Sequence, residues 1–118
     1  MFSGQGAQYV GMGKELYDNF KSSRKVFDEA DDALSYNISE LCFNGPVQNL
    51  NKTKNTQPAI LTTSIAALRL LEDEGISPDV VAGLSLGEYS ALVCSEALDF
   101  STAVKLVKKR GQFMQEAV

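Results

Sequence analysis

Residues 80–92 read VVAGLSLGEYSAL and contain the pattern Gly-x-Ser-x-Gly, with Ser85 at its centre. A short β-branched run precedes the pattern, and a segment with helical character, residues 88–94, follows it. This arrangement is typical of a nucleophile elbow, a tight strand-to-helix turn in which the flanking glycines carry no Cβ that could clash. The helix N-terminus beside the serine favours developing negative charge. The segment therefore predicts a serine nucleophile for acyl transfer within an α/β fold.

The catalytic base expected beside such a serine is missing. The 118 residues contain no histidine, and a serine hydroxyl is a weak nucleophile without an adjacent base. Glu88 is interpreted as a first-turn helix residue, because a free carboxylate is a poor base for an alcohol. From this motif alone, a serine that merely caps a helix at an ordinary turn stays an open alternative.

Length and composition suit one domain with a real hydrophobic core, since 44% of residues are hydrophobic and 22% are charged. The formal net charge of -4 argues against nonspecific nucleic-acid binding. No apolar run reaches the ~18 residues of a membrane span, and no signal peptide is expected. Cys42 and Cys94 lie far apart with no histidine nearby, which predicts neither a metal site nor a disulfide framework. Both are expected to be reduced, buried thiols in a cytoplasmic protein.

Apolar periodicity predicts three helices in the first part of the chain, over residues 12–20, 24–34 and 37–43. Ser22 or Ser23 is expected to cap the second helix, and a capping box is expected to open the third.

Two longer helices are predicted in the second part of the chain. One begins at residues 56–58 with proline in its first turn and ends at Gly75, and the other follows Asp99, its expected N-cap, to about residue 117. Only two short strands are visible, at residues 1–2 and 80–82. A parallel sheet normally has more strands, which suggests that the rest of the sheet lies beyond the last residue.

The glycine-rich segment at residues 4–6 does not fit a phosphate-binding motif. A dinucleotide fingerprint needs a third glycine where Tyr9 stands, and a P-loop needs a glycine at Gln8 and a hydroxyl at Glu15. What remains is a turn that exposes backbone N–H groups, which can supply an oxyanion donor beside a nucleophile elbow. A plain glycine turn is the open alternative.

Arg110 is predicted to lie on an apolar face of the last helix. That face carries Ala103, Leu106, Phe113 and Ala117 at three- and four-residue spacing. A cation on a face built for burial needs a carboxylate or phosphate partner, and guanidinium suits bidentate carboxylate recognition. A structural pairing with Asp99 or Glu88 stays open. The adjacent Gly111 is expected to allow close packing.

Four segments together resemble those of malonyl-CoA:acyl carrier protein transacylases. They are FSGQGAQ at residues 2–8, TQPA at 56–59, GLSLGEYSAL at 83–92 and RGQFM at 110–114. The resemblance covers essentially the whole chain. It implies that residues 1–118 are the N-terminal part of a large, α/β-hydrolase-like subdomain with a parallel sheet, and that the family's ferredoxin-like subdomain is absent from this chain.

The resemblance also implies a role for each site residue. Ser85 would attack the thioester of malonyl-CoA, and the phosphopantetheine thiol of acyl carrier protein would then collect the malonyl group. Gln5 and Leu86 would supply the oxyanion N–H groups, Arg110 would hold the malonyl carboxylate, and Gln57 would line the same pocket.

The activating base of the family is a histidine on a later segment, so the 118 residues alone are expected to be inactive. The resemblance implies a monomeric, cytoplasmic enzyme of fatty acid biosynthesis that needs no metal or cofactor. Two positions depart from the frequent family pattern, Ser3 where proline is common and Leu84 where histidine is common.

Other functions stay open from the sequence. The acyltransferase domain of a polyketide synthase shares these motifs. A serine esterase would have no need of Arg110, and an inactive fragment that only binds acyl carrier protein would tolerate Ser85→Ala. The preference for malonyl over methylmalonyl groups also stays open.

Overall fold

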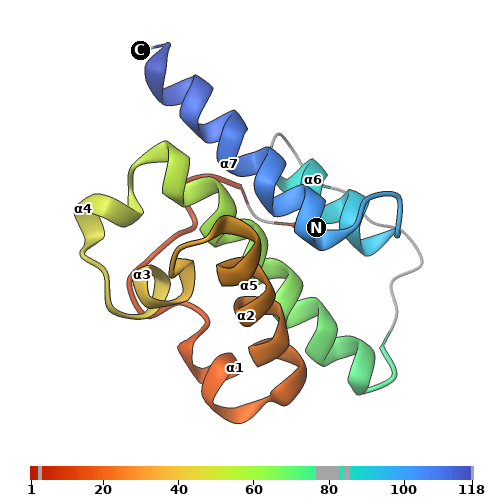
Figure 1. The fold of residues 1–118 in the computed structure, drawn as a ribbon. Coiled ribbons are helices and arrows are strands. Elements are labelled where there is room, and N and C mark those ends of the chain that lie inside the picture. The colour runs from red at the N-terminus through yellow and green to blue at the C-terminus, as the bar shows by residue number, and fades with distance from the viewer. Residues whose placement is uncertain (3, 77–82, 84–85, 118) are drawn as a thin grey trace.

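The computed structural model describes residues 1–2, 4–76, 83 and 86–117. Seven helices occur in this part of the chain (Figure 1): α1 Lys14–Asn19, α2 Lys21–Leu34, α3 Ile38–Asn44, α4 Val47–Leu50, α5 Thr53–Asp73, α6 Leu86–Cys94 and α7 Phe100–Glu116. The strand pairing found among the described residues is one parallel bridge between Phe2 and Gly83.

The parallel sheet expected from the sequence is therefore not seen among the described residues, where the fold is mostly helical. The strand predicted at residues 80–82 lies outside the described part of the chain. The strand predicted at residues 1–2 contributes only the bridge of Phe2. A sheet needs several paired strands to bury its faces, and this part of the chain supplies one paired position.

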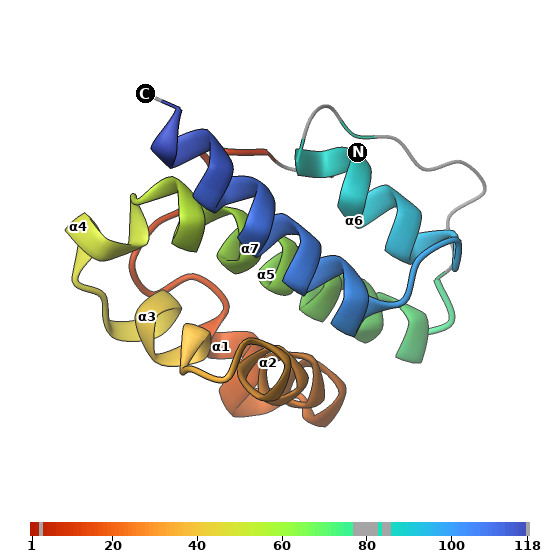
Figure 2. The ribbon, with the colours of Figure 1, turned by 45° about the horizontal axis from the view of Figure 1, so that its top comes forward.

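The long helix α5 forms the centre of the molecule, and α2, α6 and α7 pack around it (Figure 2). Residues 56–62 of this helix are all buried, so the helix is covered on almost every side there. Leu61 and Ile65 are fully buried, together with Phe27 from α2 and Val107 from α7. This packing holds the start of α5 in a fixed place relative to α6 and α7.

The starts of α2 and α5 differ from the sequence-based expectations. The N-cap of α2 is Phe20, and Ser23 is instead buried, with its hydroxyl donating to the carbonyl of Ala66 on α5 at 2.8 Å. The helix α5 begins at Thr53, so Pro58 lies inside it. Proline lacks an N–H, and the bond that is lost is the one to the carbonyl of Lys54.

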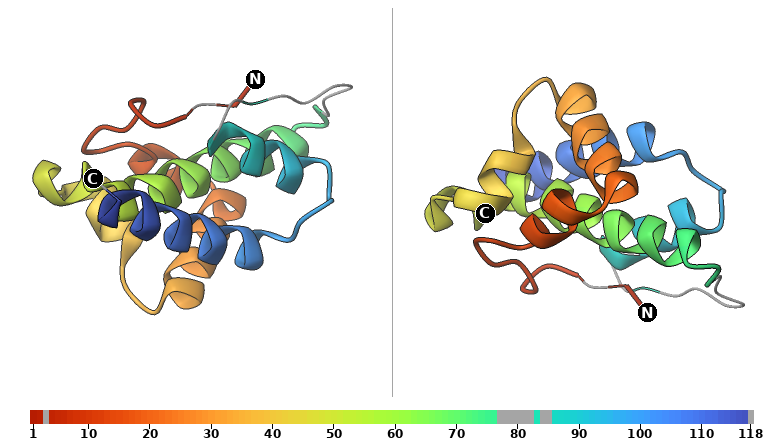
Figure 3. Two further views of the ribbon diagram at one scale, coloured as in Figure 1. Left: turned by 90° about the horizontal axis from the view of Figure 1, so that it is seen from above. Right: turned by 90° about the horizontal axis from the view of Figure 1, so that it is seen from below.

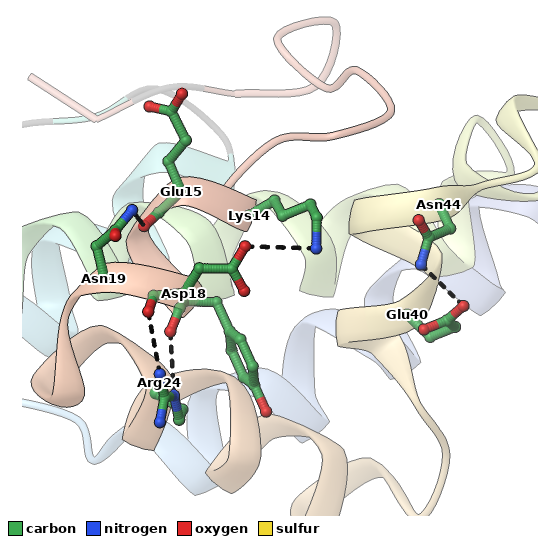
Figure 4. Close-up of polar contacts among 8 residues, drawn as sticks. Lys14, Glu15, Asp18, Asn19, Arg24, Glu40 and Asn44 are labelled. Atoms are coloured by element: carbon green, nitrogen blue, oxygen red, sulfur yellow. Dashed lines mark hydrogen bonds and ion pairs between the residues drawn. The ribbon is translucent and has the colours of Figure 1, made fainter.

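The capping box expected at the start of α3 is also wrong. Asn37 is the N-cap but makes no side-chain cap hydrogen bond. The Glu40 carboxylate accepts instead from the Asn44 amide at 2.9 Å, one turn further along the helix (Figure 4).

The short helix α1 is fastened to α2 by Arg24. Its guanidinium donates to the carbonyls of Tyr17 and Asp18, each at 3.1 Å (Figure 4). These carbonyls belong to the last turn of α1, where carbonyl groups have no partner within the helix. Lys14 and Asp18 add an exposed ion pair at 3.4 Å, which contributes little to stability because solvent screens it.

The expected N-cap of α7 is confirmed. The Asp99 carboxylate accepts from the Thr102 backbone N–H at 3.0 Å and from the Thr102 hydroxyl at 2.7 Å. The backbone N–H, and after it the hydroxyl, lowers the pKa of Asp99 because both donate to its charged form.

This lowered pKa predicts an acid-sensitive cap. A carboxyl whose pKa is lower in the folded state stabilises the fold above its ordinary pKa, and the effect is lost as the pH falls through the lowered value. We expect the melting temperature to fall more steeply below about pH 4 in the wild type than in Asp99→Asn, which keeps a capping oxygen without the charge. Equal slopes in thermal unfolding curves would contradict this role of the charge.

The buried face of α7 agrees with the predicted one at Ala103 but not at Leu106 and Phe113. Leu106 and Phe113 are exposed, at 43% and 64%, whereas Val104, Val107 and Gly111 are buried. The reason is a close approach at Gly111, where an added Cβ would lie 2.6 Å from the carbonyl oxygen of Thr53 on α5. This contact turns α7 so that Arg110 lies half-buried at the edge of the packed face.

We expect Gly111→Ala to destabilise the protein. Overpacking costs about 1–3 kcal/mol, and alanine recovers about 1 kcal/mol through its higher helix propensity. The backbone atoms of α5 that a Cβ would meet cannot rotate away, so the cost should dominate. Denaturant unfolding would measure the difference, with the exposed neighbour Gln112→Ala as the control. A Gly111→Ala protein more stable than the wild type would contradict the close packing.

Both cysteines are free, as predicted. Cys42 is buried, and burial raises its pKa to about 12. Cys94 is only partly buried, which corrects the expectation that both are buried. Within the described segments, no helix is long and apolar enough to cross a membrane.

Candidate functional site

Gln57 is the centre of the polar network that links the predicted site residues. It lies in α5 and its side chain is almost completely buried, at 1% exposure. Its amide oxygen accepts a hydrogen bond from the Arg110 guanidinium. Its amide nitrogen donates to the side-chain oxygen of Gln5 at 3.3 Å and approaches the Met114 sulfur at 3.9 Å. A single amide therefore connects α5, α7 and the N-terminal loop.

The Arg110 guanidinium is fixed from two sides. Besides the bond to Gln57, its carbon lies 5.7 Å from the ring centroid of Tyr89 on α6, within the range of a cation–π contact. Gln57 and Tyr89 are uncharged, so these two contacts orient the cation without cancelling its charge. Asp99, considered from the sequence as a structural partner, caps the start of α7 through Thr102, eleven residues before Arg110.

The glycine-rich loop at residues 4–8 lies next to this network. The Gln5 side chain is exposed and donates to the Thr53 hydroxyl at 3.4 Å. The loop is closed by a bond from the Ala7 N–H to the Gly4 carbonyl at 3.2 Å and by one from the Gly6 N–H to the Gln8 side chain at 2.8 Å. Among the described residues, no hydrogen bond partner is found for the Gln5 backbone N–H, the group that an oxyanion donor would use.

The two glycines of the predicted elbow approach each other closely. A Cβ added to Gly83 would collide with the backbone carbonyl of Gly87, so the backbones of the two glycines are in close contact. Leu86 is the first residue of α6 and is buried, and the N–H groups of a first helical turn have no partner within the helix. Ser85 and Leu84 lie outside the described residues, as does Ser3.

The structure thus links three of the five predicted site residues to one another. Gln5, Gln57 and Arg110 are linked directly, and Leu86 lies one turn before Tyr89 on α6. Tyr89 was missed by sequence reasoning, although it stands in the GEYSAL segment beside the elbow. Among the described residues, no group of three or more histidine, cysteine or acidic side chains could hold a metal ion.

Comparison with known proteins identifies the family of this chain. The family model for the acyl transferase domain matches residues 1–118. The chain belongs to this family. Among acyl transferases, the chain is 54% identical to the malonyl CoA-acyl carrier protein transacylase of Bacillus subtilis (strain 168), over 100% of this chain and 37% of that protein. It therefore spans little more than a third of the length of such relatives.

Solved structures share the overall fold of this chain. The malonyl CoA-acyl carrier protein transacylase of Clostridium perfringens has a TM-score of 0.95 at 59% identity, covering 99% of this chain and 37% of that one. A malonyl-transacylase solved in complex with a type II polyketide synthase acyl-carrier protein has a TM-score of 0.94 at 47% identity, covering 99% of this chain and 38% of that one.

Proposed function

We propose that the protein carrying this acyl transferase segment moves a malonyl group from malonyl-CoA to the phosphopantetheine thiol of acyl carrier protein, in fatty acid biosynthesis. The observation that supports this most directly is the oriented Arg110 beside the elbow helix, held by Gln57 and Tyr89. Malonyl groups carry a free carboxylate, and a fixed guanidinium recognises a carboxylate through two parallel hydrogen bonds.

The reaction would pass through a malonyl ester of Ser85. The serine oxygen attacks the thioester carbonyl, and the Gln5 and Leu86 backbone N–H groups stabilise the oxyanion that forms. The carbon–sulfur bond then breaks and coenzyme A leaves as the thiol. The thiol of acyl carrier protein attacks the ester in the same way and releases Ser85. Because the 118 residues contain no histidine, the proton of the serine hydroxyl would pass to a base from another part of the protein.

Further properties are proposed on the same basis. The parallel bridge between Phe2 and Gly83 comes directly before the elbow, as in the sheet of an α/β-hydrolase-like subdomain, of which residues 1–118 would be the N-terminal part. We expect a cytoplasmic monomer without metal or cofactor. A polyketide carrier protein is a second candidate acceptor, because one of the similar structures holds such a protein.

Malonyl transfer can be tested on the full-length protein with purified carrier proteins of fatty acid and polyketide synthesis. Mass spectrometry of each carrier protein would report malonyl transfer from malonyl-CoA, with acetyl-CoA as a substrate that lacks the carboxylate. We expect fast malonyl transfer and slow acetyl transfer. Equal rates for the two substrates would contradict the role given to Arg110.

The orientation of Arg110 can be tested by Gln57→Glu. The new carboxylate would pair with the guanidinium and compete with the malonyl carboxylate, so we expect kcat/KM for malonyl-CoA to fall by about 10–1,000-fold. The exposed Gln112→Glu on α7 makes the same charge change and should leave the rate unaltered. A Gln57→Glu protein with wild-type kinetics would exclude a contact between Arg110 and the substrate.

A further inference from the structure

A polar pocket lies among α3, the start of α5 and the middle of α7. Its volume is about 360 Å³. Three of the residues that line it are lysines, namely Lys52, Lys54 and Lys108, and Tyr36 and Asn55 complete its polar wall. The residues that line this pocket include no carboxylate. A hollow with this lining is suited to an anion.

The ammonium group of Lys108 is held in place by uncharged partners. It donates to the Tyr36 hydroxyl at 3.1 Å and to the Asn55 side-chain oxygen at 3.2 Å, and it lies 4.5 Å from the centroid of the Tyr36 ring. The Asn55 amide nitrogen is in turn fixed by the carbonyl of Asn49 at 2.9 Å. The cation is therefore positioned in advance, which lowers the entropic cost of binding a ligand.

Two of the positive charges in this pocket, those of Lys54 and Lys108, lie near enough to act on each other. Burial lowers the pKa of Lys108, and the charge of Lys54 lowers it further. The helix α5 starts at Thr53, so the positive end of its dipole adds to the same field. The acid whose charge acts on Tyr36 is Asp31. Its carboxylate already accepts hydrogen bonds from the backbone N–H and the hydroxyl of Ser39. An anion in the pocket would relieve the repulsion between the lysines.

This pocket is separate from the acyl-transfer site. Asn55 lies two residues before Gln57 on α5, and Lys108 lies two residues before Arg110 on α7. Two residues correspond to about 200° around a helix, so each pair points to opposite sides. Figure 3 shows the same relation, with the N-terminal segment on one side of α5 and α3 on the other.

We propose that this lysine pocket binds the phosphate group of a small ligand, independently of the acyl-transfer site. A phosphate group carries more than one negative charge and several acceptor oxygens, which matches a pocket lined by three lysines better than a single carboxylate would. The phosphate can belong to free inorganic phosphate or to a nucleotide, and these two sources share the chemistry that the pocket recognises.

Isothermal titration of the full-length protein would test the site with inorganic phosphate and, separately, with adenosine 3′,5′-bisphosphate. We expect saturable binding, weakened by about tenfold to a hundredfold in Lys108→Met, because a hydrogen bond to a charged group is removed. Lys54→Met should weaken binding too. This second variant keeps the test valid if Lys108→Met fails to fold. The matched control is Lys109→Met, an exposed neighbour that loses the same charge and should bind as the wild type does.

Comparison of the two ligands shows whether the bound phosphate belongs to a nucleotide or is free inorganic phosphate. Tighter binding of the bisphosphate would assign the pocket to a nucleotide, and equal binding would assign it to free phosphate; both results support the proposal. Absence of saturable binding of either ligand, or binding unchanged in both Lys108→Met and Lys54→Met, would overturn it.

Discussion

Arg110→Ala is expected to reduce kcat/KM for malonyl transfer by about 10²–10⁴-fold, because the malonyl carboxylate would then lie in the site without its charged partner. Gln57 and Tyr89 orient the guanidinium but carry no charge that could replace it. Steady-state kinetics of the full-length protein with malonyl-CoA and acyl carrier protein would measure the loss.

Two comparisons distinguish the loss of carboxylate recognition from a loss of folding. The exposed neighbour Lys109→Ala removes a cation from the same helix and should leave the kinetics unchanged. Transfer of an acetyl group, which has no carboxylate, should survive Arg110→Ala. An Arg110→Ala enzyme that transfers malonyl groups at the wild-type rate would exclude recognition of the malonyl carboxylate by Arg110 and would favour a serine esterase.

The second large effect is expected for Gly83→Ala. The added Cβ would collide with the backbone of Gly87, at the start of α6. Relief of this clash must move the first turn of α6, and with it the Leu86 N–H proposed for the oxyanion. Because a displacement of about 1 Å can cost about 10²-fold in rate, we expect malonyl transfer to fall by at least that factor. Overpacking should also cost about 1–3 kcal/mol of stability.

A suitable control is Gly75→Ala at the end of α5. A Cβ there meets no atom within 4 Å, although the positive φ of 81° carries a backbone cost. This variant should lose some stability and keep its activity. If Gly83→Ala were as active as Gly75→Ala, the close contact between Gly83 and Gly87 would not be needed to place the oxyanion donors.

Local signals in the sequence were sufficient for most helices but not for their starts. Asp99 was predicted correctly because its cap involves only Thr102, three residues away. Ser23 was misinterpreted because its hydroxyl bonds to Ala66 on another helix. The face of α7 was predicted only in part for a similar reason, since the close contact of Gly111 with α5 decides which side is buried.

The candidate site was accessible from the sequence mainly because its motifs resemble a known family. Spacing alone identified Arg110 as unusual, but it could not show that Gln57 holds it, because the two residues lie 53 positions apart. Tyr89 was missed since a tyrosine in a helix carries no distinctive local signal. The lysine pocket was equally hidden, because Tyr36, Asn55 and Lys108 meet only after α5 and α7 have packed.

Ser85 is proposed to carry a malonyl group during the reaction, and the intact mass of the full-length protein after mixing with malonyl-CoA tests this step. We predict a mass increase of one malonyl group per protein, which is absent in Ser85→Ala and is lost again when acyl carrier protein is added. A wild-type protein that gains no mass, or a Ser85→Ala protein that gains as much as the wild type, would contradict the account.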